Sequence, residues 1–313
     1  MKKVVITGAT SMIGTALIQY LISQGIEVLA ISRRMTDELT EFEKTGKCKV
    51  AICDLEEISL FRTISLDGKV LYDNDYDAFI HLAWAGTFGV ARQHEDLQIQ
   101  SIQYTLDCAK LAHRLGCHTF LGVGSQAEYG RVDGVIKYDT PTNPDTPYGI
   151  AKLAACRMSR HYAQSMGMKH VWVRIFSVYG PHDNPKTMIM SSIANLLDGK
   201  PMSYTEATQM WNYLYVEDAA RGIALACDKG KDGEVYCIAF HQNYPLKDYI
   251  LCLRETINEK AEIEFGKVPC NGSKPIELFV DTAREIKELG FYPDYTFYGG
   301  LLKTIEWYKK NKN

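Results

Sequence analysis

The chain has 313 residues, a formal net charge of −3, 46% hydrophobic residues and 23% charged residues. This is ordinary globular composition, and the charge provides no positive field that would attract nucleic acid or an anionic membrane. No apolar run approaches the roughly 20 residues of a membrane span, and Gly8, Thr10 and Ser11 interrupt the N-terminal run before it reaches signal-peptide length. We therefore expect a cytoplasmic protein whose partner is a small molecule, with no nucleic acid or membrane.

The first half of the chain alternates short apolar runs with segments of helical periodicity. Apolar residues between Met12 and Leu21 recur at helical spacing, and longer helices are predicted at about 94–115 and 148–165. The apolar runs predict strands at 3–7, 27–32, 49–53, 78–82, 119–123 and 170–176. Strands that alternate with helices in this way indicate right-handed βαβ units and a parallel sheet covered on both faces.

After about residue 180 this alternation loosens, and proline and glycine become denser. The remaining patterns predict helices at 188–197, 216–227 and about 246–258, and strands at 234–239 and 261–265. The fold class is therefore α/β: a Rossmann-type doubly wound parallel sheet in residues 1–180, with a smaller α/β C-terminal substrate lobe in residues 181–313. We expect one or more later segments to return to the first domain. The lobe would lie over the carboxyl edge of the sheet, where open α/β sheets bind ligands.

A glycine turn follows the first predicted strand. A tight turn at Gly8 would let the backbone N–H groups of the helix start, at Ser11, Met12 and Ile13, face a pyrophosphate. Gly14 supplies a small residue where helix and strand nearly touch. Many strand–helix turns hold no ligand, but this one opens the first βαβ unit, where a dinucleotide fingerprint belongs. The turn therefore predicts a dinucleotide cofactor.

The residues after the second predicted strand bear on which cofactor binds. NAD enzymes usually place Asp or Glu there to hold the ribose 2′-OH, whereas this chain has Ser32, Arg33 and Arg34. A carboxylate would repel a 2′-phosphate, and a guanidinium pairs with it in fork geometry. Two exposed arginines are also ordinary surface, but their position favours NADP(H), with NAD as the alternative.

A tyrosine and a lysine four residues apart carry the predicted chemistry. Tyr148 and Lys152 would share one helix face, where the ammonium would lower the tyrosine pKa. Tyr308 and Lys312 have the same spacing, but we interpret them as part of a solvated tail. Ser125, at the end of the fifth predicted strand, can hydrogen-bond a substrate oxygen beside Tyr148. The ordered set of glycine turn, serine, tyrosine and lysine predicts an oxidoreductase site.

This set resembles the extended short-chain dehydrogenase/reductase family, also called the NAD-dependent epimerase/dehydratase family. The resemblance covers nearly the whole chain, including residues 173–181 (VRIFSVYGP) and 213–218 (YLYVED). It implies a homodimer paired through the two long helices and catalysis by Ser125, Tyr148 and Lys152. It also implies contacts to the cofactor by Asp54, Leu55, Leu82, Ala83, Trp84 and Phe176, and contacts to the substrate by Trp84, Ser125, Gln126, Ser177, Trp211 and Asn212.

The family's usual reaction is hydride transfer at C4 of a nucleotide-activated sugar. Its dehydratases carry Asp-Glu directly after the serine/threonine position, where this chain has Gln126 and Ala127, so dehydration is not expected. A 4-epimerase that retains NAD and a 4-ketoreductase that uses NADPH both remain. Residues 124–130 (GSQAEYG) and 209–213 (QMWNY) resemble nucleotide-sugar 4-ketoreductases such as CDP-abequose and CDP-paratose synthases, which favours the reductase.

Two positions depart from the family pattern where the substrate diphosphate is usually bound. Ser177 stands where the epimerases usually have Asn, and Trp211 stands where they have Arg. Trp211 can stack on a base or a sugar, or it can be a core residue, but it cannot neutralise phosphate. The missing positive charge would come from one of three residues: Arg92, Lys186 or Lys200.

Two other classes of function fit the sequence less well. Some members of the family are NADP(H)-binding regulators, which often lose the tyrosine or the lysine, whereas this chain keeps both. A metal hydrolase is weaker still, because the nine cysteines and eight histidines show no metal-ligand spacing. We expect no metal, and most cysteines lie in apolar segments typical of a reducing cytosol.

Overall fold

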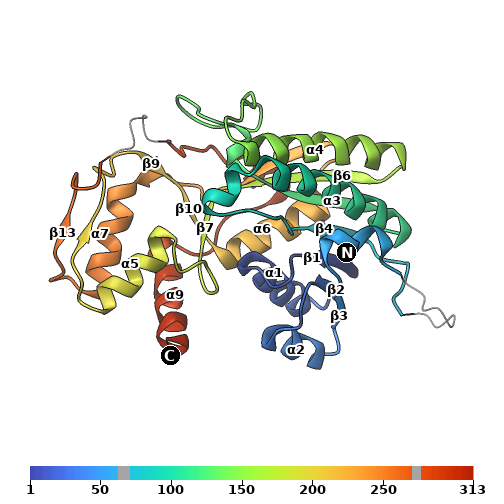
Figure 1. The fold of residues 1–313 in the computed structure, drawn as a ribbon, viewed down its shortest axis with the longest axis horizontal. Coiled ribbons are helices and arrows are strands. Elements are labelled where there is room, and N and C mark those ends of the chain that lie inside the picture. Colours follow the sequence, from blue (N-terminus) through green and yellow to red (C-terminus); the bar gives the residue numbers. More distant parts are fainter. Residues whose placement is uncertain (63–70, 270–275, 313) are drawn as a thin grey trace.

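The computed structural model describes residues 1–62, 71–269 and 276–312 (Figure 1). Its centre is a seven-stranded sheet of order β11-β6-β5-β4-β1-β2-β3, and every pairing in it is parallel. The order runs outward in both directions from β1 and β4, so the predicted doubly wound Rossmann-type sheet is confirmed. The strands are β1 (Lys3–Thr7), β2 (Glu27–Ser32), β3 (Cys48–Ile52), β4 (Ala78–His81), β5 (Thr119–Ser125), β6 (Lys169–Ile175) and β11 (Glu234–Ile238).

Helices cover both faces of this sheet. On one face α1 (Met12–Ser23) packs beside α6 (Val216–Lys229), and on the other α3 (Glu95–Arg114) packs beside α4 (Pro147–Ser165). The alternation along β1 shows why both faces are apolar. Val4 and Ile6 belong to the core under α1 and α6, and Val5 belongs to the core under α3. The short helix α2 (Asp37–Lys44) joins β2 to β3.

The smaller lobe is built from helices and short strand pairs. Its helices α5 (Met188–Leu197), α7 (Leu246–Ile257) and α9 (Phe297–Asn311) share one apolar core with β7 and β10. The strand pairs are β7 (Ser177–Tyr179) with β10 (Tyr213–Tyr215), β8 (Met202–Ser203) with β13 (Ile263–Glu264), and β9 (Met210–Trp211) with β12 (Tyr244–Pro245). Figure 1 shows this lobe beside the carboxyl end of the sheet.

Segments after residue 180 also complete the first domain. The predicted strand at 234–239 is β11, which pairs with β6 as an edge of the large sheet. The helix α8 (Ala283–Leu289) packs on β11 and α6. The later chain therefore crosses between the two parts of the molecule more than once. In the described ranges, no helix is both long and apolar enough to cross a membrane.

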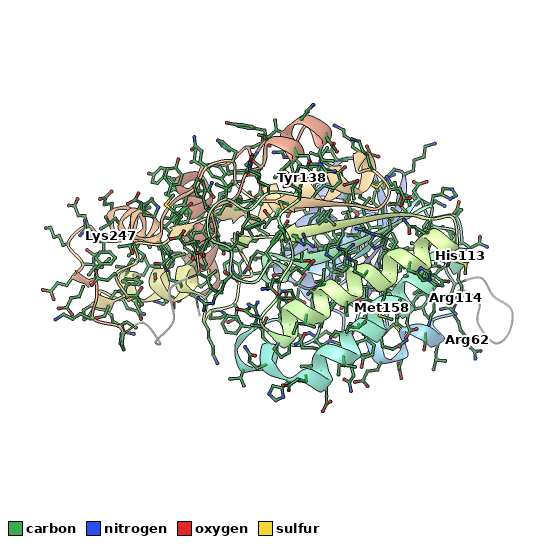
Figure 2. All side chains as sticks on the ribbon, turned by 90° about the horizontal axis from the view of Figure 1, so that it is seen from above. Arg62, His113, Arg114, Tyr138, Met158 and Lys247 are labelled. Carbon is green, nitrogen blue, oxygen red and sulfur yellow. The ribbon has the colours of Figure 1, made fainter. Side chains whose placement is uncertain are left out.

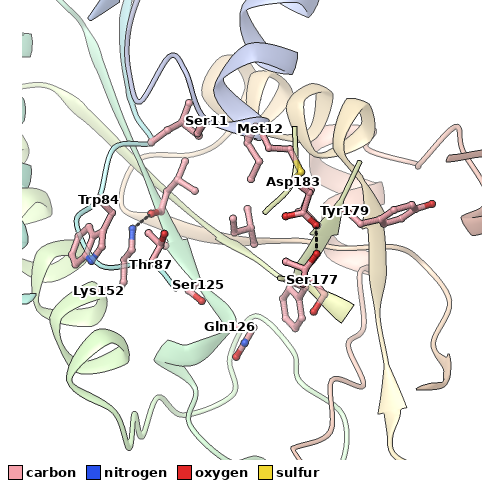
Figure 3. A pocket seen from close by; sticks show the side chains of 18 of the residues that line it. Ser11, Met12, Trp84, Thr87, Ser125, Gln126, Lys152, Ser177, Tyr179 and Asp183 are labelled. Atoms are coloured by element: carbon pink, nitrogen blue, oxygen red, sulfur yellow. Dashed lines mark hydrogen bonds between the residues drawn. The ribbon is translucent and has the colours of Figure 1, made fainter. Parts of the chain in front are cut away.

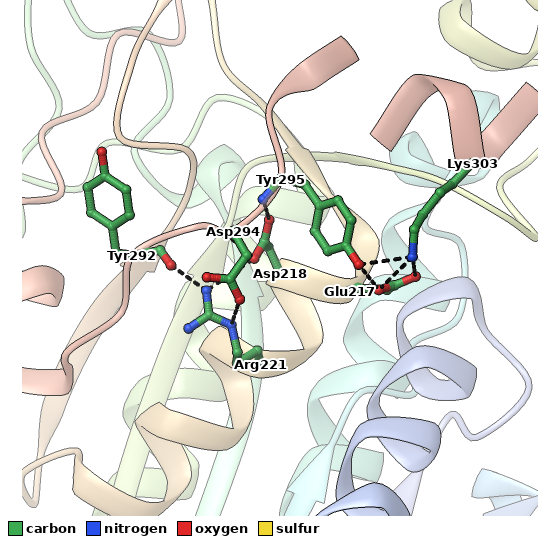
Figure 4. Close-up of polar contacts among 7 residues, drawn as sticks. All are labelled: Glu217, Asp218, Arg221, Tyr292, Asp294, Tyr295 and Lys303. Atoms are coloured by element: carbon green, nitrogen blue, oxygen red, sulfur yellow. Dashed lines mark hydrogen bonds and ion pairs between the residues drawn. The ribbon is translucent and has the colours of Figure 1, made fainter. Parts of the chain in front are cut away.

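A polar cluster ties the C-terminal segment to α6 (Figure 4). Asp218, which is 1% exposed, accepts hydrogen bonds from the backbone N–H groups of Asp294 at 2.8 Å and Tyr295 at 3.0 Å. Lys303 of α9 pairs with Glu217 at 3.1 Å. Because the acceptors stand at the start of α6, these bonds fix the beginning of α9 against the first domain.

The expectation of a solvated C-terminal tail was wrong. The chain forms the helix α9 up to Asn311, in which Leu301 and Ile305 are buried. Tyr308 packs against the core of the smaller lobe, and Lys312 Nζ lies 2.6 Å from Asp198 Oδ1. This second tyrosine–lysine pair is therefore structural and belongs to the smaller lobe.

Candidate active site

A cavity of about 400 Å³ lies at the carboxyl end of the sheet, between the glycine turn and the strands β7 and β10 (Figure 3). The sheet places it there because β1, β4, β5 and β6 all end at this edge. Many of the residues predicted for the site line it: Ser11, Met12, Ile13, Leu82, Trp84, Ser125, Gln126, Tyr148, Lys152, Phe176 and Ser177. The fold thus brings together, in one cavity, side chains that are separated in the sequence by up to about half the length of the chain.

The glycine turn brings two backbone segments into close approach. Gly8 has a φ of +78°, and a Cβ at this position would lie 2.7 Å from Ala83 N. A Cβ at Gly14 would lie 2.2 Å from Gly8 O. Ser11 caps α1, because its Oγ accepts from Gly14 N at 3.0 Å and donates to Gly8 O at 2.8 Å. The first N–H groups of α1, at Met12 and beyond, therefore open at the cavity wall, as anion binding requires.

The start of α4 brings the predicted tyrosine to Ser125. Thr146 caps the helix, and Tyr148 lies in its first turn, 8% exposed and close enough to Ser125 for that side chain to lower its pKa. Lys152, one turn further, donates from Nζ to Val123 O at 2.7 Å. The same ammonium lies 3.8 Å from the centre of the Trp84 ring. Tyrosine, serine and lysine thus converge at one end of the cavity.

Burial and nearby charges shift the pKa of both catalytic candidates. Burial raises the pKa of Tyr148, and the positive charge of Arg92 and the side chain of Ser125 oppose this rise. Burial lowers the pKa of Lys152 to about 7, and Glu128 opposes this fall. Lys152 is therefore poised to exchange a proton near neutral pH.

Arg92, rather than Lys152, supplies the positive charge next to the phenol. Its guanidinium carbon lies 4.3 Å from the centre of the Tyr148 ring, whereas Lys152 Nζ is 5.9 Å from it. Sequence reasoning assigned this electrostatic role to Lys152 and considered Arg92 only as a partner for phosphate. Arg92 does line the cavity, unlike Lys186 and Lys200, the other two candidates for that charge.

Glu128 does not line the cavity, and its buried carboxylate accepts a hydrogen bond from the backbone of Ser125. Its Oε1 accepts from Ser125 N at 2.9 Å and from Trp172 Nε1 at 3.0 Å, and its Oε2 lies 2.8 Å from Arg174 Nε. Glu128 is 0% exposed. Gly124 makes room for it, because a Cβ at this position would lie 2.0 Å from Glu128 Oε1. This buried carboxylate therefore positions the serine and cannot reach a substrate in this arrangement.

Sequence reasoning missed Asp183, which lines the cavity on the side of the smaller lobe. Burial raises the pKa of its carboxyl to about 6, opposed by hydrogen bonds from Thr187 Oγ1 at 2.9 Å and Asn184 N at 2.7 Å. The signal in the sequence is weak: an aspartate four residues before the threonine that caps α5. Asp183 adds a group that can titrate near neutral pH inside the site.

The residues predicted to select the cofactor lie together beyond the cavity. Arg33 and Arg34 are exposed just after β2, and Asp54 follows the adjacent strand β3. Arg33 Nε is 4.0 Å from Asp54 Oδ2. Asp54 also caps the 3-10 turn η1 (Leu55–Leu60) by accepting from Glu56 N at 3.3 Å. These side chains follow the ends of β2 and β3, the strands next to β1, after which the glycine turn begins.

Two predicted substrate contacts lie outside the cavity. Asn212 is 0% exposed, and its amide bonds Phe240 O at 2.9 Å and Phe240 N at 2.8 Å. Trp211 packs against a core cluster that includes Phe176 and Cys237. Asn212 therefore holds two backbone segments together, and Trp211 lies partly buried beside them.

The doubly wound sheet, the glycine turn and the convergent serine, tyrosine and lysine define the class of this protein: an NAD(P)-dependent enzyme of the short-chain dehydrogenase type. A sequence model of the NAD dependent epimerase/dehydratase family matches residues 4–239, and the chain belongs to this family. In the part of the chain that the structure describes, no group of His, Cys, Asp or Glu side chains is arranged to hold a metal ion.

Relatives of known activity extend over the whole chain. The dTDP-glucose 4,6-dehydratase of Neisseria meningitidis is 26% identical over 344 residues, which cover 100% of this chain and 94% of the relative. That of Streptomyces niveus is 27% identical over 327 residues, which cover 99% of this chain and 94% of the relative. The UDP-glucose 4-epimerase structure from Thermotoga maritima has a TM-score of 0.83 at 20% identity and covers 99% of this chain and 100% of that one. The UDP-glucuronic acid 4-epimerase of Bacillus cereus, solved with NAD, has a TM-score of 0.82 at 22% identity. The match covers 99% of this chain and 100% of that one.

Proposed function

We propose that this chain is an NADP(H)-dependent oxidoreductase that acts at C4 of a nucleotide-activated sugar, in the manner of a 4-keto-6-deoxyhexose reductase. The observation that carries the proposal is the convergence of Ser125, Tyr148 and Lys152 on one cavity beside the glycine turn. Relatives named for dTDP-glucose and UDP-glucose support a nucleotide sugar as the substrate class.

The glycine turn fits a dinucleotide, because Gly8 and Gly14 leave no space for a Cβ and expose the start of α1. When bound, the nicotinamide supplies the hydride. Lys152, anchored by Val123 O, would hold a ribose hydroxyl with its remaining N–H donors. Trp84 covers the lysine and limits access of water to it.

The proton in the proposed reaction comes from Tyr148. As hydride reaches the C4 carbon, the phenol gives its proton to the C4 oxygen, and the ketone becomes an alcohol. Ser125 stabilises the charge that develops on that oxygen, because its hydroxyl lines the same cavity as the phenol. Arg92 stabilises the phenolate that remains, since its guanidinium lies over the ring. Lys152 can then pass a proton back to the tyrosine.

The preference for NADP(H) rests on Arg33 and Arg34. Both are exposed just after β2, and no carboxylate occupies the usual acidic position. The ion pair between Arg33 and Asp54 is long, at 4.0 Å, and the arginine side chain is 78% exposed. Such a pair is weak and leaves the guanidinium available for a 2′-phosphate. NAD remains the alternative, because structural neighbours were solved with it.

A direct assay tests the proposal. The protein is incubated with NADPH and a CDP- or dTDP-4-keto-6-deoxyhexose, and the product is identified by NMR. Oxidation of NADPH in step with formation of a 4-hydroxy sugar nucleotide supports the reductase. Interconversion of UDP-glucose and UDP-galactose without net oxidation of cofactor would instead assign the alternative 4-epimerase, the activity named for some of the structural neighbours.

Dehydration is disfavoured although the curated relatives are dehydratases. Gln126 and Ala127 stand where the acid–base pair is expected, and the nearby carboxylate of Glu128 is held by Ser125 and Arg174. A neutral amide and a methyl group cannot shuttle the protons that loss of water requires. Loss of water from dTDP-glucose in the same assay would reverse this assignment.

We also propose a cytoplasmic homodimer that pairs through α3 and α4. Three large apolar side chains on these helices are substantially exposed: Ile99 at 62%, Ile150 at 54% and Met158 at 47%. Figure 2 shows Met158 on the outer side of α4. A partner helix pair would cover this face. The free cysteines, mostly buried, support a reducing compartment.

A further inference from the structure

A second cavity, of about 540 Å³, lies at the outer edge of the sheet and shares no lining residue with the candidate active site. Its walls are α4, the edge strand β11, the start of α8 and the loop of residues 138–142, whose Tyr138 is labelled in Figure 2. Four arginines line it: Arg157, Arg160, Arg174 and Arg284. We call this cavity the arginine pocket. Its volume lies in the range of small-molecule sites.

Two of the four arginines have structural partners. Arg174 is paired with the buried Glu128 at 2.8 Å, and Arg284 is paired with Glu234 at 2.6 Å. Arg284 also stacks over the Tyr138 ring at 4.4 Å. These pairs hold two guanidinium groups of the lining in fixed positions.

The other two arginines have no such partner. Arg157 and Arg160 lie one turn apart on α4, and neither forms an ion pair among the described residues. Arg160 Nε is buried and has no hydrogen-bond partner there. Arg157, Arg160 and Arg174 all act on the thiol of Cys156 to lower its pKa, although burial dominates and raises it to about 12. The helix therefore presents uncompensated positive charge to the pocket.

We propose that the arginine pocket binds a small molecule that carries at least two phosphate groups. Guanidinium groups bond phosphate oxygens in pairs, and several around one cavity suit a multiply charged anion. The carboxylates on the pocket wall are Asp139 and Glu234, and Glu234 is already paired with Arg284. Thr140 and Thr142 add hydroxyl groups to the lining. The site is separate from the nicotinamide cleft and from the proposed catalytic function.

Calorimetric titration of the whole protein with inorganic pyrophosphate tests this site. Pyrophosphate that binds in the candidate active site is distinguished by the variants below, because its heat persists when Arg157 and Arg160 are replaced, and the equivalents counted here are those of the arginine pocket. We expect one equivalent to bind, and Arg157→Gln combined with Arg160→Gln to weaken binding by about tenfold or more. These two residues are chosen because Arg174 and Arg284 hold structural ion pairs. Arg114→Gln, at the exposed end of α3, is the matched control and should leave binding unchanged.

The single variant Arg157→Gln guards against misfolding, because Arg157 is exposed on the helix surface. It should weaken binding while its thermal unfolding matches that of the wild type. The proposal is overturned if the wild type shows no saturable binding, or if the double variant binds as tightly as the wild type. Equal weakening by Arg114→Gln would also overturn it, since it would show general attraction to surface charge. No turnover is measured, so the result stands apart from the fate of the proposed reaction.

Discussion

The guanidinium of Arg92 lies over the ring of Tyr148, with 4.3 Å between the guanidinium carbon and the ring centre. Arg92 comes from the 3-10 turn η2 (Gly89–Gln93), and Tyr148 opens α4. Two segments far apart in the sequence thus set the proton affinity of the candidate acid. Burial raises the pKa of Tyr148, and this arginine is the first of the groups that oppose the rise.

Arg92→Gln should raise the pKa of Tyr148 further. The reductase requires the protonated phenol, so its activity falls as pH rises through this pKa. Without the arginine, the alkaline fall in kcat/KM should therefore move to higher pH, and the pH profile measures this shift. Arg92→Lys, which keeps a positive charge, should move the profile less. A fall at unchanged or lower pH in Arg92→Gln contradicts the assigned role.

Glu128→Gln should destabilise the protein strongly. The substitution leaves the guanidinium of Arg174 buried without its counter-charge, which costs about 3–5 kcal/mol in the free energy of unfolding. Urea denaturation measures this change. Glu41→Gln removes one partner of an exposed ion pair with Lys44 and should have little effect. If both variants unfold at the same urea concentration, the buried ion pair between Glu128 and Arg174 does not stabilise the fold as stated here.

The sequence predicts most of the strands of the large sheet, and it predicts that Ser125, Tyr148 and Lys152 lie together. The apolar runs were long enough to identify its strands, and the carboxyl ends of parallel strands must meet at one edge. Ser125 ends one such strand, and Tyr148 and Lys152 share a helix face, so their convergence follows from topology alone.

The remaining features depend on tertiary packing that no local pattern encodes. Arg92 reaches the phenol only because a short 3-10 turn docks beside α4. Glu128 is fully buried, whereas a glutamate in a loop-like sequence normally indicates an exposed residue. The pattern suits Trp211 equally to a ligand or to a core, and the structure shows its side chain partly buried against a core cluster. The docking of the C-terminal helix through Asp218 is likewise a long-range contact.

Replacing Arg33 and Arg34 together by serine should change cofactor selection. The dissociation constant for NADPH should rise by about tenfold, because charge-assisted hydrogen bonds to the 2′-phosphate are lost. Binding of NADH, which lacks that phosphate, should hardly change and serves as the internal control. Fluorescence titration of both cofactors gives the two constants. An equal loss for NADPH and NADH would argue against a 2′-phosphate site at these residues.

Ile150→Glu combined with Met158→Glu should convert the proposed dimer into a monomer, because two carboxylates would be buried in an apolar helix interface. Light scattering coupled to size-exclusion chromatography measures the mass. Leu302→Glu, at a 44% exposed position of α9, is the control and should leave the dimer intact. A double variant that stays dimeric would place the interface elsewhere. A wild type that is monomeric would contradict the proposed dimer.

The catalytic role of Tyr148 is the central claim, and a single-turnover measurement with Tyr148→Phe tests it most directly. Enzyme in excess is mixed with NADPH and a 4-keto-6-deoxy sugar nucleotide, and Tyr308→Phe, from the structural tyrosine–lysine pair, is measured alongside. We predict that Tyr148→Phe slows hydride transfer by about 10²–10⁴-fold while NADPH binding is retained, and that Tyr308→Phe reacts like the wild type. A Tyr148→Phe variant as fast as the wild type, or a wild type that binds NADPH but turns over no nucleotide sugar, would contradict the account.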